Sequence, residues 1–432
     1  MDVLNAWSIY LKKCLKLFGW FFLLVLIAVF ILLVLALQTK PLVVSSYTVT
    51  PGTAQSAEQL ALRMHRAYNN TELTITADEA NALIAIARRL YPTVHGRVNI
   101  GNQQLLAAAS VPLVQDKLYL NVSVLLLPSK KGLAVHEVRV GQLRVSGALT
   151  LKMAEWIGNR YLPPEGATQL LAAIQEVSFQ QDELWVRYQL PEQFQPDQVV
   201  RLRDQWQPYG DPKHIQHYYQ LLAQHKADSL VLSDYLQVLF TEAAYRSQHQ
   251  GSAVAENQAA LLALGVFFGT SKLELLLGDV RQNSHYASSP PRVTLAGRLD
   301  LQQHFVYSAV IKTLTNKNIG FLAGEMKELL DANPGGSGFS FVDLLADMAG
   351  VRFAEIALQS EKSARALQQI IVDNGLNDID LLPDFSTLPE GLYYDAFRDN
   401  FDTVESEQYQ LMLKHINQAL IELPVYRLLN AE

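Results

Sequence analysis

The chain has 432 residues, of which 49% are apolar and only 18% are charged, below the ~25% charged residues of an average soluble domain. Its 42 acidic and 35 basic residues give a net charge of −7, which argues against a nucleic-acid-binding protein. The single cysteine excludes an internal disulfide and a thiolate zinc site. At roughly 150 residues per domain, the length predicts two or three domains.

The apolar excess is concentrated near the N-terminus, where residues 17–37 contain no charged side chain. As a helix this stretch would be about 30 Å long, which matches the hydrocarbon core of a bilayer. A cleaved signal peptide would have a shorter apolar core and a small-residue cleavage site, so a retained signal anchor is the favoured interpretation over a cleaved signal or a buried helix. The sequence therefore predicts a transmembrane helix over residues 17–38.

The flanking charges predict the orientation of this span. Lys12, Lys13 and Lys16 precede it, whereas only Lys40 follows closely, and positive charge accumulates on the cytoplasmic side. Residues 1–16 are thus expected to be a cytoplasmic tail and the chain after about residue 40 to be periplasmic, with the span in the inner membrane of a Gram-negative bacterium. The membrane bilayer is the one partner that this pattern implies.

The next part of the chain is expected to form a tether over residues 39–56, including an edge strand over 43–49, and an α+β module over 57–195. Thr76 and Glu79 have the spacing of a capping box at the start of a helix over 77–90. Apolar and polar residues alternate over 117–128, which predicts a strand. Further helices are expected at 57–68, 150–160 and 164–175, and further strands at 73–76, 133–140, 142–146, 177–180 and 184–190. Together they predict a curved antiparallel sheet with helices on one side.

Residues 40–195 resemble the YpmS-type family of single-span envelope proteins. The resemblance depends on the N-terminal span, the run from Leu73 to Ile84, the Val140–Leu143 segment between two strands, and the final helix and hairpin. It implies an extracytoplasmic α+β module that cradles a lipid or another apolar ligand. The alternative is that the apolar face of the strands simply forms a core.

Residues 196–432 are expected to form an all-α domain, because prolines separate stretches with helical periodicity. No repeat of fixed length links these stretches. The expected helices cover 197–206, 213–226, 229–248, 253–276, 301–315, 320–332, 341–358, 361–374 and 405–421.

Three of these helices carry a candidate polar site. Asp300 and His304 are four residues apart, and so are Asp343 and Asp347, which places each pair on one helix face. Between them Glu328 lies on the middle helix, flanked at three-residue steps by Glu325 and Asp331 and followed by the loop Gly335–Gly338. If the helices pack together, His304 and these carboxylates converge.

The segment 298–353 resembles the YfiM/VanZ-like envelope families. The matching residues are Asp300, His304 and Phe305, then Lys327, Glu328 and Asp331, then Phe339, Ser340, Asp343, Asp347 and Gly350. The sequence departs from the family pattern at Gln302, where the family has lysine, and its first motif is one residue longer. The resemblance implies an envelope protein with an important polar cluster, and it implies no particular reaction.

Three interpretations of the cluster stay open. The first is a structural network in which carboxylates cap helices and Arg298, Lys327 and Arg352 balance the charge, with Ser340 as an N-cap. The second is a divalent metal site for Mn, Fe or Mg, although the repeated Glu-x-x-His of dinuclear sites is missing. The third is acid–base chemistry by Glu328 or Asp343, with His304 as proton shuttle. No cofactor is expected, and a divalent metal is the less favoured alternative.

The favoured function is an accessory or scaffold protein that binds a lipid or a cell-wall component. The alternative is a periplasmic hydrolase that uses Asp300, His304, Glu328, Asp343 and Asp347. No nucleic acid is expected as a partner, and the sequence identifies no protein partner.

Overall fold

The structure is a computed structural model. It describes the chain except for residues 1, 45–46, 67–70, 115–116, 162–164, 191–208, 226–229, 270–272, 274–276, 278–279, 282–289, 316–318 and 431–432, and it describes only the backbone of 2–17, 19, 65, 250 and 429–430. Two compact units are present, one made of 1–47 and 59–191 and the other of 48–58 and 192–432. Antiparallel sheets lie in the N-terminal half and the C-terminal region is helical, which confirms the predicted α+β class.

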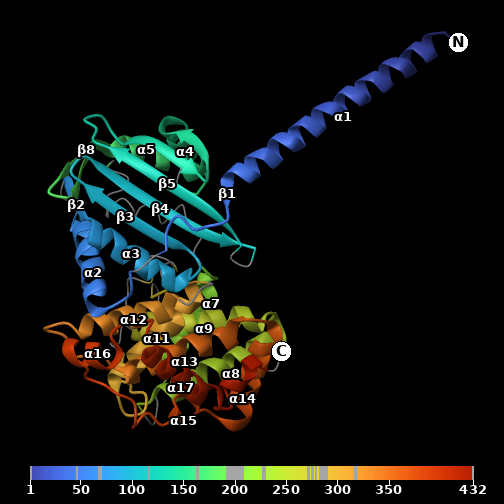
Figure 1. The fold of residues 1–432 in the computed structure, drawn as a ribbon. Coiled ribbons are helices and arrows are strands. Elements are labelled where there is room, and N and C mark those ends of the chain that lie inside the picture. The colour runs from blue at the N-terminus through green and yellow to red at the C-terminus, as the bar shows by residue number, and fades with distance from the viewer. Residues whose placement is uncertain are drawn as a thin grey trace. The chain divides into compact units, whose positions relative to one another are not determined.

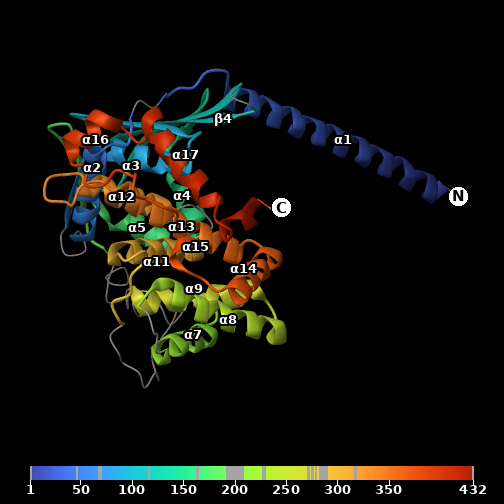
Figure 2. The same ribbon diagram turned by 90° about the horizontal axis from the view of Figure 1, so that it is seen from below.

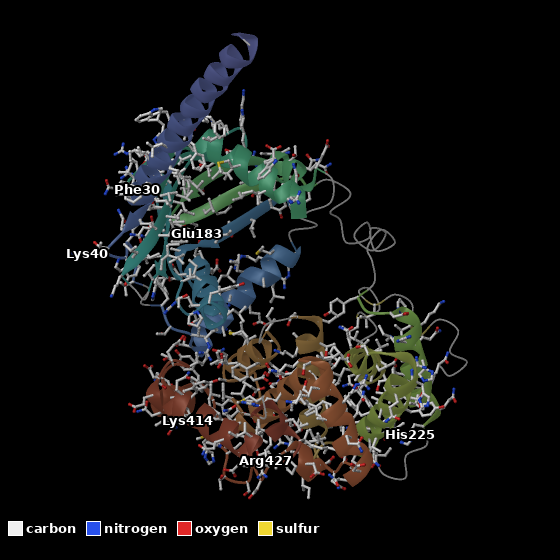
Figure 3. All side chains as sticks on the ribbon, turned by 90° about the vertical axis from the view of Figure 1, so that its right-hand side faces the viewer. Phe30, Lys40, Glu183, His225, Lys414 and Arg427 are labelled. Atoms are coloured by element: carbon white, nitrogen blue, oxygen red, sulfur yellow. The ribbon has the colours of Figure 1, made fainter. Side chains whose placement is uncertain are left out.

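The first unit begins with helix α1 (Asp2–Ala36), which continues directly into strand β1 (Leu37–Gln38) (Figure 1). The large apolar side chains of α1 between Phe18 and Val34 that the structure describes are mostly exposed, as Phe30 illustrates (Figure 3). Among the described residues, no helix is long and apolar enough to cross a membrane. The predicted cytoplasmic tail lies outside the residues whose side chains are described.

The large sheet of this unit has the order β3-β4-β5-β6-β7, with every pair antiparallel. Strand β1 pairs with the part of β5 that β6 leaves free, since Leu37 lies opposite Leu120. The strands are β3 (His95–Gly101), β4 (Gln104–Leu113), β5 (Leu118–Leu127), β6 (Ala134–Val140) and β7 (Leu143–Ser146). The sequence reasoning missed β3 and β4, because Gly96 and Gly101 of β3 and the alanine run 107–109 of β4 have low β-propensity.

A second, three-stranded sheet has the order β2-β9-β8, so the single predicted sheet is in fact two. Its strands are β2 (Glu72–Thr76), β8 (Ile174–Gln180) and β9 (Glu183–Tyr188). Buried apolar side chains from both sheets form the core: Ile100 and Leu105 from the first, and Val177, Phe179 and Leu184 from the second.

Four helices accompany these sheets: α2 (Pro51–Arg66), α3 (Ala77–Leu90), α4 (Gly147–Tyr161) and α5 (Gly166–Ala173). The predicted capping box of α3 is confirmed, because Thr76 Oγ1 accepts from the Glu79 N–H and the Glu79 carboxylate accepts from the Thr76 N–H. Helix α2 begins at Pro51, so residues 51–56 of the predicted tether are helical. Among the described residues of 43–49 no strand forms.

The second unit is helical (Figure 2). Its helices are α7 (Pro212–Gln224), α8 (Leu232–Gln250), α9 (Ala253–Phe268), α11 (Leu299–Leu314), α12 (Ile319–Asp331), α13 (Phe341–Leu358), α14 (Glu361–Asn374), α15 (Asp378–Leu381), α16 (Tyr394–Phe401), α17 (Glu407–Ile421) and the 3-10 helix η4 (Tyr426–Asn430). Most of its long helices lie within three residues of the predicted bounds, but α9 ends at Phe268, where Gly269 is the C-cap, and not at the predicted residue 276. The short helices α15, α16 and η4 were not predicted. The helix expected at 197–206 lies outside the described residues.

Glycines allow α11, α12 and α13 to approach one another closely. A Cβ atom on Gly350 of α13 would lie 2.2 Å from the backbone oxygen of Phe305 on α11. A Cβ atom on Gly324 of α12 would lie 2.0 Å from Asp347 Oδ2 on α13. Both distances are far shorter than van der Waals contact, so the three helices can meet in this way only because these positions lack a side chain.

Candidate functional site

The candidate site lies where α11, α12 and α13 meet, and it joins four of the five predicted site residues. His304 comes from α11, Glu328 from α12, and Asp343 and Asp347 from α13. All four are buried, with exposed fractions between 0% for Glu328 and 8% for Asp343. The predicted convergence of the three helices is therefore present.

The imidazole of His304 is oriented by a buried carboxylate. Its Nδ1 lies 2.9 Å from Asp347 Oδ2, and Asp347 Oδ1 accepts a hydrogen bond of 2.6 Å from Ser308 Oγ. Because Asp347 is 2% exposed and hydrogen-bonded at both oxygens, it fixes the ring plane. A proton on Nδ1 then leaves the Nε2 lone pair directed away from Asp347.

On its other side the imidazole faces two more carboxylates. Nε2 of His304 lies 3.5 Å from Asp343 Oδ2 and 3.7 Å from Glu328 Oε1. Neither contact satisfies hydrogen-bond geometry, and the ring nitrogen has no hydrogen bond to the residues that the structure describes. The three atoms thus surround a common point without bonding to one another.

The start of α13 ties Glu328 to the site. Ser340 Oγ accepts a hydrogen bond from the Asp343 N–H at 3.0 Å, which makes Ser340 the N-cap, as predicted. The Ser340 N–H in turn donates to Glu328 Oε2 at 3.0 Å. The remaining oxygen, Oε1, is the one that faces His304.

Two cations lie beside the carboxylates. Lys327 Nζ is 2.9 Å from Glu328 Oε1 and 2.7 Å from Asp331 Oδ2. The guanidinium of Arg298 contacts Asp343 Oδ1 at 3.4 Å, but it also binds Asp300 and Glu390. The positive charge near the cluster is therefore shared with carboxylates outside it.

Burial determines the protonation of the cluster. It raises the pKa of Glu328 to about 7, against the opposing effect of Lys327. Burial also raises the pKa of Asp343 and of Asp347 above the usual range. For His304, burial lowers the pKa, but the hydrogen bond and negative charge of Asp347 outweigh it, so the pKa lies above its ordinary value. All four groups therefore hold protons more tightly than they would in water.

A cavity of about 200 Å³ lies against the His304–Asp347 side of the cluster. His304 and Asp347 both line this cavity, together with Ser308 and Tyr307 of α11 and Gly324 and Lys327 of α12. The site thus has an adjoining space, which a purely structural network does not need.

The other predicted acidic residues lie outside this cluster. Asp300 forms a two-point ion pair with Arg298 at 2.6 and 3.2 Å, and the hydrogen bond to Arg298 holds the pKa of Asp300 below its usual range. Buried Glu325 accepts from Tyr409 Oη at 2.8 Å. Arg352, expected as a counter-charge, instead donates to Asn417. The sequence reasoning missed Ser308, although it is four residues from His304 and therefore on the same helix face.

A second cavity lies in the first unit, between α3 and the large sheet. Its volume is about 350 Å³, and its lining is almost wholly apolar. The sheet contributes Val98, Ala107, Ala109, Val122 and Val124. Arg88 also lines it, donating from one terminal nitrogen to Tyr47 O at 3.2 Å, while its buried Nε has no hydrogen-bond partner among the residues that the structure describes.

Comparisons with protein-family models, with curated proteins and with solved structures gave no match. The two resemblances described above accordingly stay predictions. The class of the site is defined by its own geometry, as a buried histidine–carboxylate centre in a helical unit.

Proposed function

We propose that this protein is a single-pass, membrane-anchored envelope hydrolase whose catalytic centre is the cluster of His304, Glu328, Asp343 and Asp347. The observation that carries the proposal is the convergence of His304 Nε2 with one oxygen of Asp343 and one of Glu328. A cavity of about 200 Å³ adjoins the opposite, Asp347-bound side of the same imidazole. This favours the hydrolase over the accessory role as the function of the helical unit. The substrate class is a lipid or a cell-wall component.

The chemistry expected of the centre is the activation of water. Asp347 holds the imidazole, as the orienting carboxylate does in other hydrolytic sites, and the three facing atoms would polarise a water molecule placed between them and accept its proton. The raised pKa of Glu328, about 7, suits a group that gives and takes protons near neutrality. Asp300 has a positioning role, because it binds Arg298 beside Asp343.

The anchor proposal is supported by the uncharged stretch 17–37 and by the exposed apolar side chains of α1. In this arrangement the tail 1–16 is cytoplasmic, residues 17–38 span the inner membrane of a Gram-negative bacterium, and the chain from residue 39 onward is periplasmic.

One set of full-length variants tests location and activity together. In spheroplasts, an impermeant maleimide is expected to spare Cys14 and to label a C14S/T387C variant, because position 387 is exposed on the second unit. The detergent-purified protein is assayed with nitrophenyl esters, nitrophenyl phosphates, phospholipid and peptidoglycan fragments. H304A and D347N are expected to lose at least about 100-fold in kcat/KM, while H415A, at an exposed histidine, retains activity.

Circular dichroism and melting temperature are measured for each variant. Activity of folded H304A equal to that of the wild type would exclude the hydrolase. Loss of activity in step with loss of folded protein would instead support the structural network. Labelling of Cys14 in intact spheroplasts would contradict the anchor.

The apolar cavity of the first unit supports a second function. We propose that this cavity binds a lipid acyl chain. The lining is apolar, the volume of about 350 Å³ is in the range of ligand sites, and the unpaired Nε of Arg88 offers a donor to an anionic head group. This is the lipid-binding role that the resemblance to the YpmS-type family implies for residues 40–195.

Two neighbouring residues of β5 provide the test, because successive side chains of a strand point to opposite faces. Val122 lines the apolar cavity and Ser123 lines a groove on the other face. Mass spectrometry of the purified full-length chain is expected to find lipid in the wild type and in S123F. V122F, which fills the cavity, is expected to carry several-fold less. Equal lipid in V122F and S123F would count against the site.

A further inference from the structure

We infer that His304, Glu328 and Asp343 form a binding site for one divalent first-row transition ion. Nε2 of His304, one oxygen of Glu328 and one oxygen of Asp343 all lie within 4.8 Å of one another. In the described part of the chain, no other group of three histidine or carboxylate side chains has ligand atoms this close together. The inference deepens the proposed hydrolase and uses the same site, where the ion would occupy the position assigned above to water.

The separations between these atoms fit ligands of a common ion. A first-row metal binds nitrogen and carboxylate oxygen at about 2.0–2.2 Å, so neighbouring ligands of one ion lie about 3.0–3.5 Å apart. The two measured separations from Nε2 are 3.5 and 3.7 Å. They are too long for good hydrogen bonds and need only a small contraction around an ion.

The surroundings of His304 match the second shell of a metal site. A histidine ligand usually donates its other ring N–H to a carboxylate, which fixes its tautomer and its orientation. Here the carboxylate is that of Asp347, whose Oδ2 lies 2.9 Å from His304 Nδ1. Ser308 Oγ donates a hydrogen bond of 2.6 Å to the other oxygen of Asp347. Nε2 is thereby left as an acceptor. The side chain is 93% buried, since 7% of it is exposed, and Nε2 lacks a hydrogen bond within the described structure.

The charge balance also favours a cation. Glu328, Asp343 and Asp347 lie around His304, and burying carboxylates is costly where nearby positive charge balances them only in part. Arg298 is 3.4 Å from Asp343 and divides its charge among three carboxylates. Lys327 contacts Glu328, but its side chain is half exposed and also pairs with Asp331, so it can turn toward solvent when an ion binds.

The donor set indicates the kind of ion. One imidazole and two carboxylates are intermediate between the nitrogen and sulfur ligands typical of structural zinc and the all-oxygen ligands of Mg²⁺ or Ca²⁺. Manganese(II) and zinc(II) are therefore suitable probes. The protein supplies three ligands and leaves further coordination positions open, as catalytic metal sites do.

Titration of the EDTA-treated, full-length protein with Mn²⁺ and with Zn²⁺ tests the inference by calorimetry, and for Mn²⁺ by electron paramagnetic resonance. The wild type is expected to bind one equivalent. H304A, E328Q and D343N should each weaken binding at least 100-fold, and D347N ten- to 100-fold. E355Q is the matched control, because it removes a carboxylate from the same helix as Asp343, one that pairs with Lys312 and with no group of the cluster, and its affinity should stay within about threefold of the wild type.

Absence of a stoichiometric site in the wild type would overturn the inference, and so would equal affinity in E355Q and the three ligand variants. D347N keeps all three ligands, so its intermediate loss separates a metal site from a general folding defect. Ion binding without hydrolysis would retain the metal site and remove the proposed enzyme. Hydrolysis that continues in EDTA, together with no ion binding, would retain the proposed enzyme and exclude the metal site.

Discussion

Replacement of Gly350 by alanine is expected to lower the free energy of unfolding by about 3 kcal/mol, at the upper end of the usual cost of overpacking a core. The added methyl group would lie 2.2 Å from the backbone oxygen of Phe305. A backbone atom in the middle of a helix cannot rotate aside as a side chain can. Relief therefore requires α11 and α13 to separate, and they are buried against each other here.

The control for this substitution is Gly52→Ala in α2, where a Cβ atom would meet only Thr50 Oγ1, at 3.7 Å. That change is expected to be neutral or to stabilise by up to about 1 kcal/mol, because alanine favours the helix over glycine. Urea unfolding of both variants gives the comparison. If G350A unfolds at the same urea concentration as G52A, the helix contact inferred from Gly350 is wrong.

Stability in the absence of metal is expected to fall as the pH rises from about 4.5 to about 7. The pKa of Glu328 is raised by burial to about 7 from an ordinary value near 4.5, so the folded state binds a proton that the unfolded state has already lost. The resulting stabilisation is complete below pH 4.5 and disappears as the pH passes 7. For this fully buried side chain the change is on the order of 3 kcal/mol.

The other buried groups of the cluster change stability in the same direction. The pKa values of Asp343, Asp347 and His304 are all raised. Groups with lowered pKa values, such as Asp300 and Glu256, act oppositely, but the change that they cause occurs below about pH 4.5, and their stabilisation is fully present above that pH. They do not cancel the decline over the window above it.

Urea unfolding in EDTA at pH 5, 6, 7 and 8 measures this decline. The stability of E328Q is expected to depend less on pH than that of the wild type, with a fall that is smaller by up to about 3 kcal/mol over this range, whereas E355Q, which removes the partner of Lys312, should retain the wild-type slope. A rise in the free energy of unfolding of the wild type from pH 5 to pH 7 would contradict the raised pKa of Glu328. Adding Mn²⁺ should reduce the decline, since metal binding requires the deprotonated ligands.

Much of the helical unit was predictable because its helices carry strong local signals. Helix α13 begins after the N-cap Ser340, and α14 begins after Ser360, at the predicted residues. The spacing of Asp343 and Asp347 placed both on one face, and both reach the site. Local spacing defines a face of a helix, but it does not identify the helix that packs against that face.

The less successful predictions depended on distant partners. Asp300 shares a helix with His304, yet Arg298, two residues away, takes both of its carboxylate oxygens. Strands β3 and β4 have weak intrinsic preference and form through pairing with each other and with β5. The division into two sheets likewise depends on β2 pairing with β9, more than 100 residues later, and such pairings have no local signature.

The contact between Gly324 and Asp347 has an evolutionary consequence. A Cβ atom at position 324 would lie 2.0 Å from one carboxylate oxygen of Asp347 and 2.4 Å from its carbon, so a side chain there would displace the carboxylate from the position in which it binds His304. Glycine at 324 and aspartate at 347 are therefore expected to be retained together. A sequence pattern that requires glycine at 324 together with aspartate at 347 would select distant relatives by the architecture of the site rather than by overall similarity.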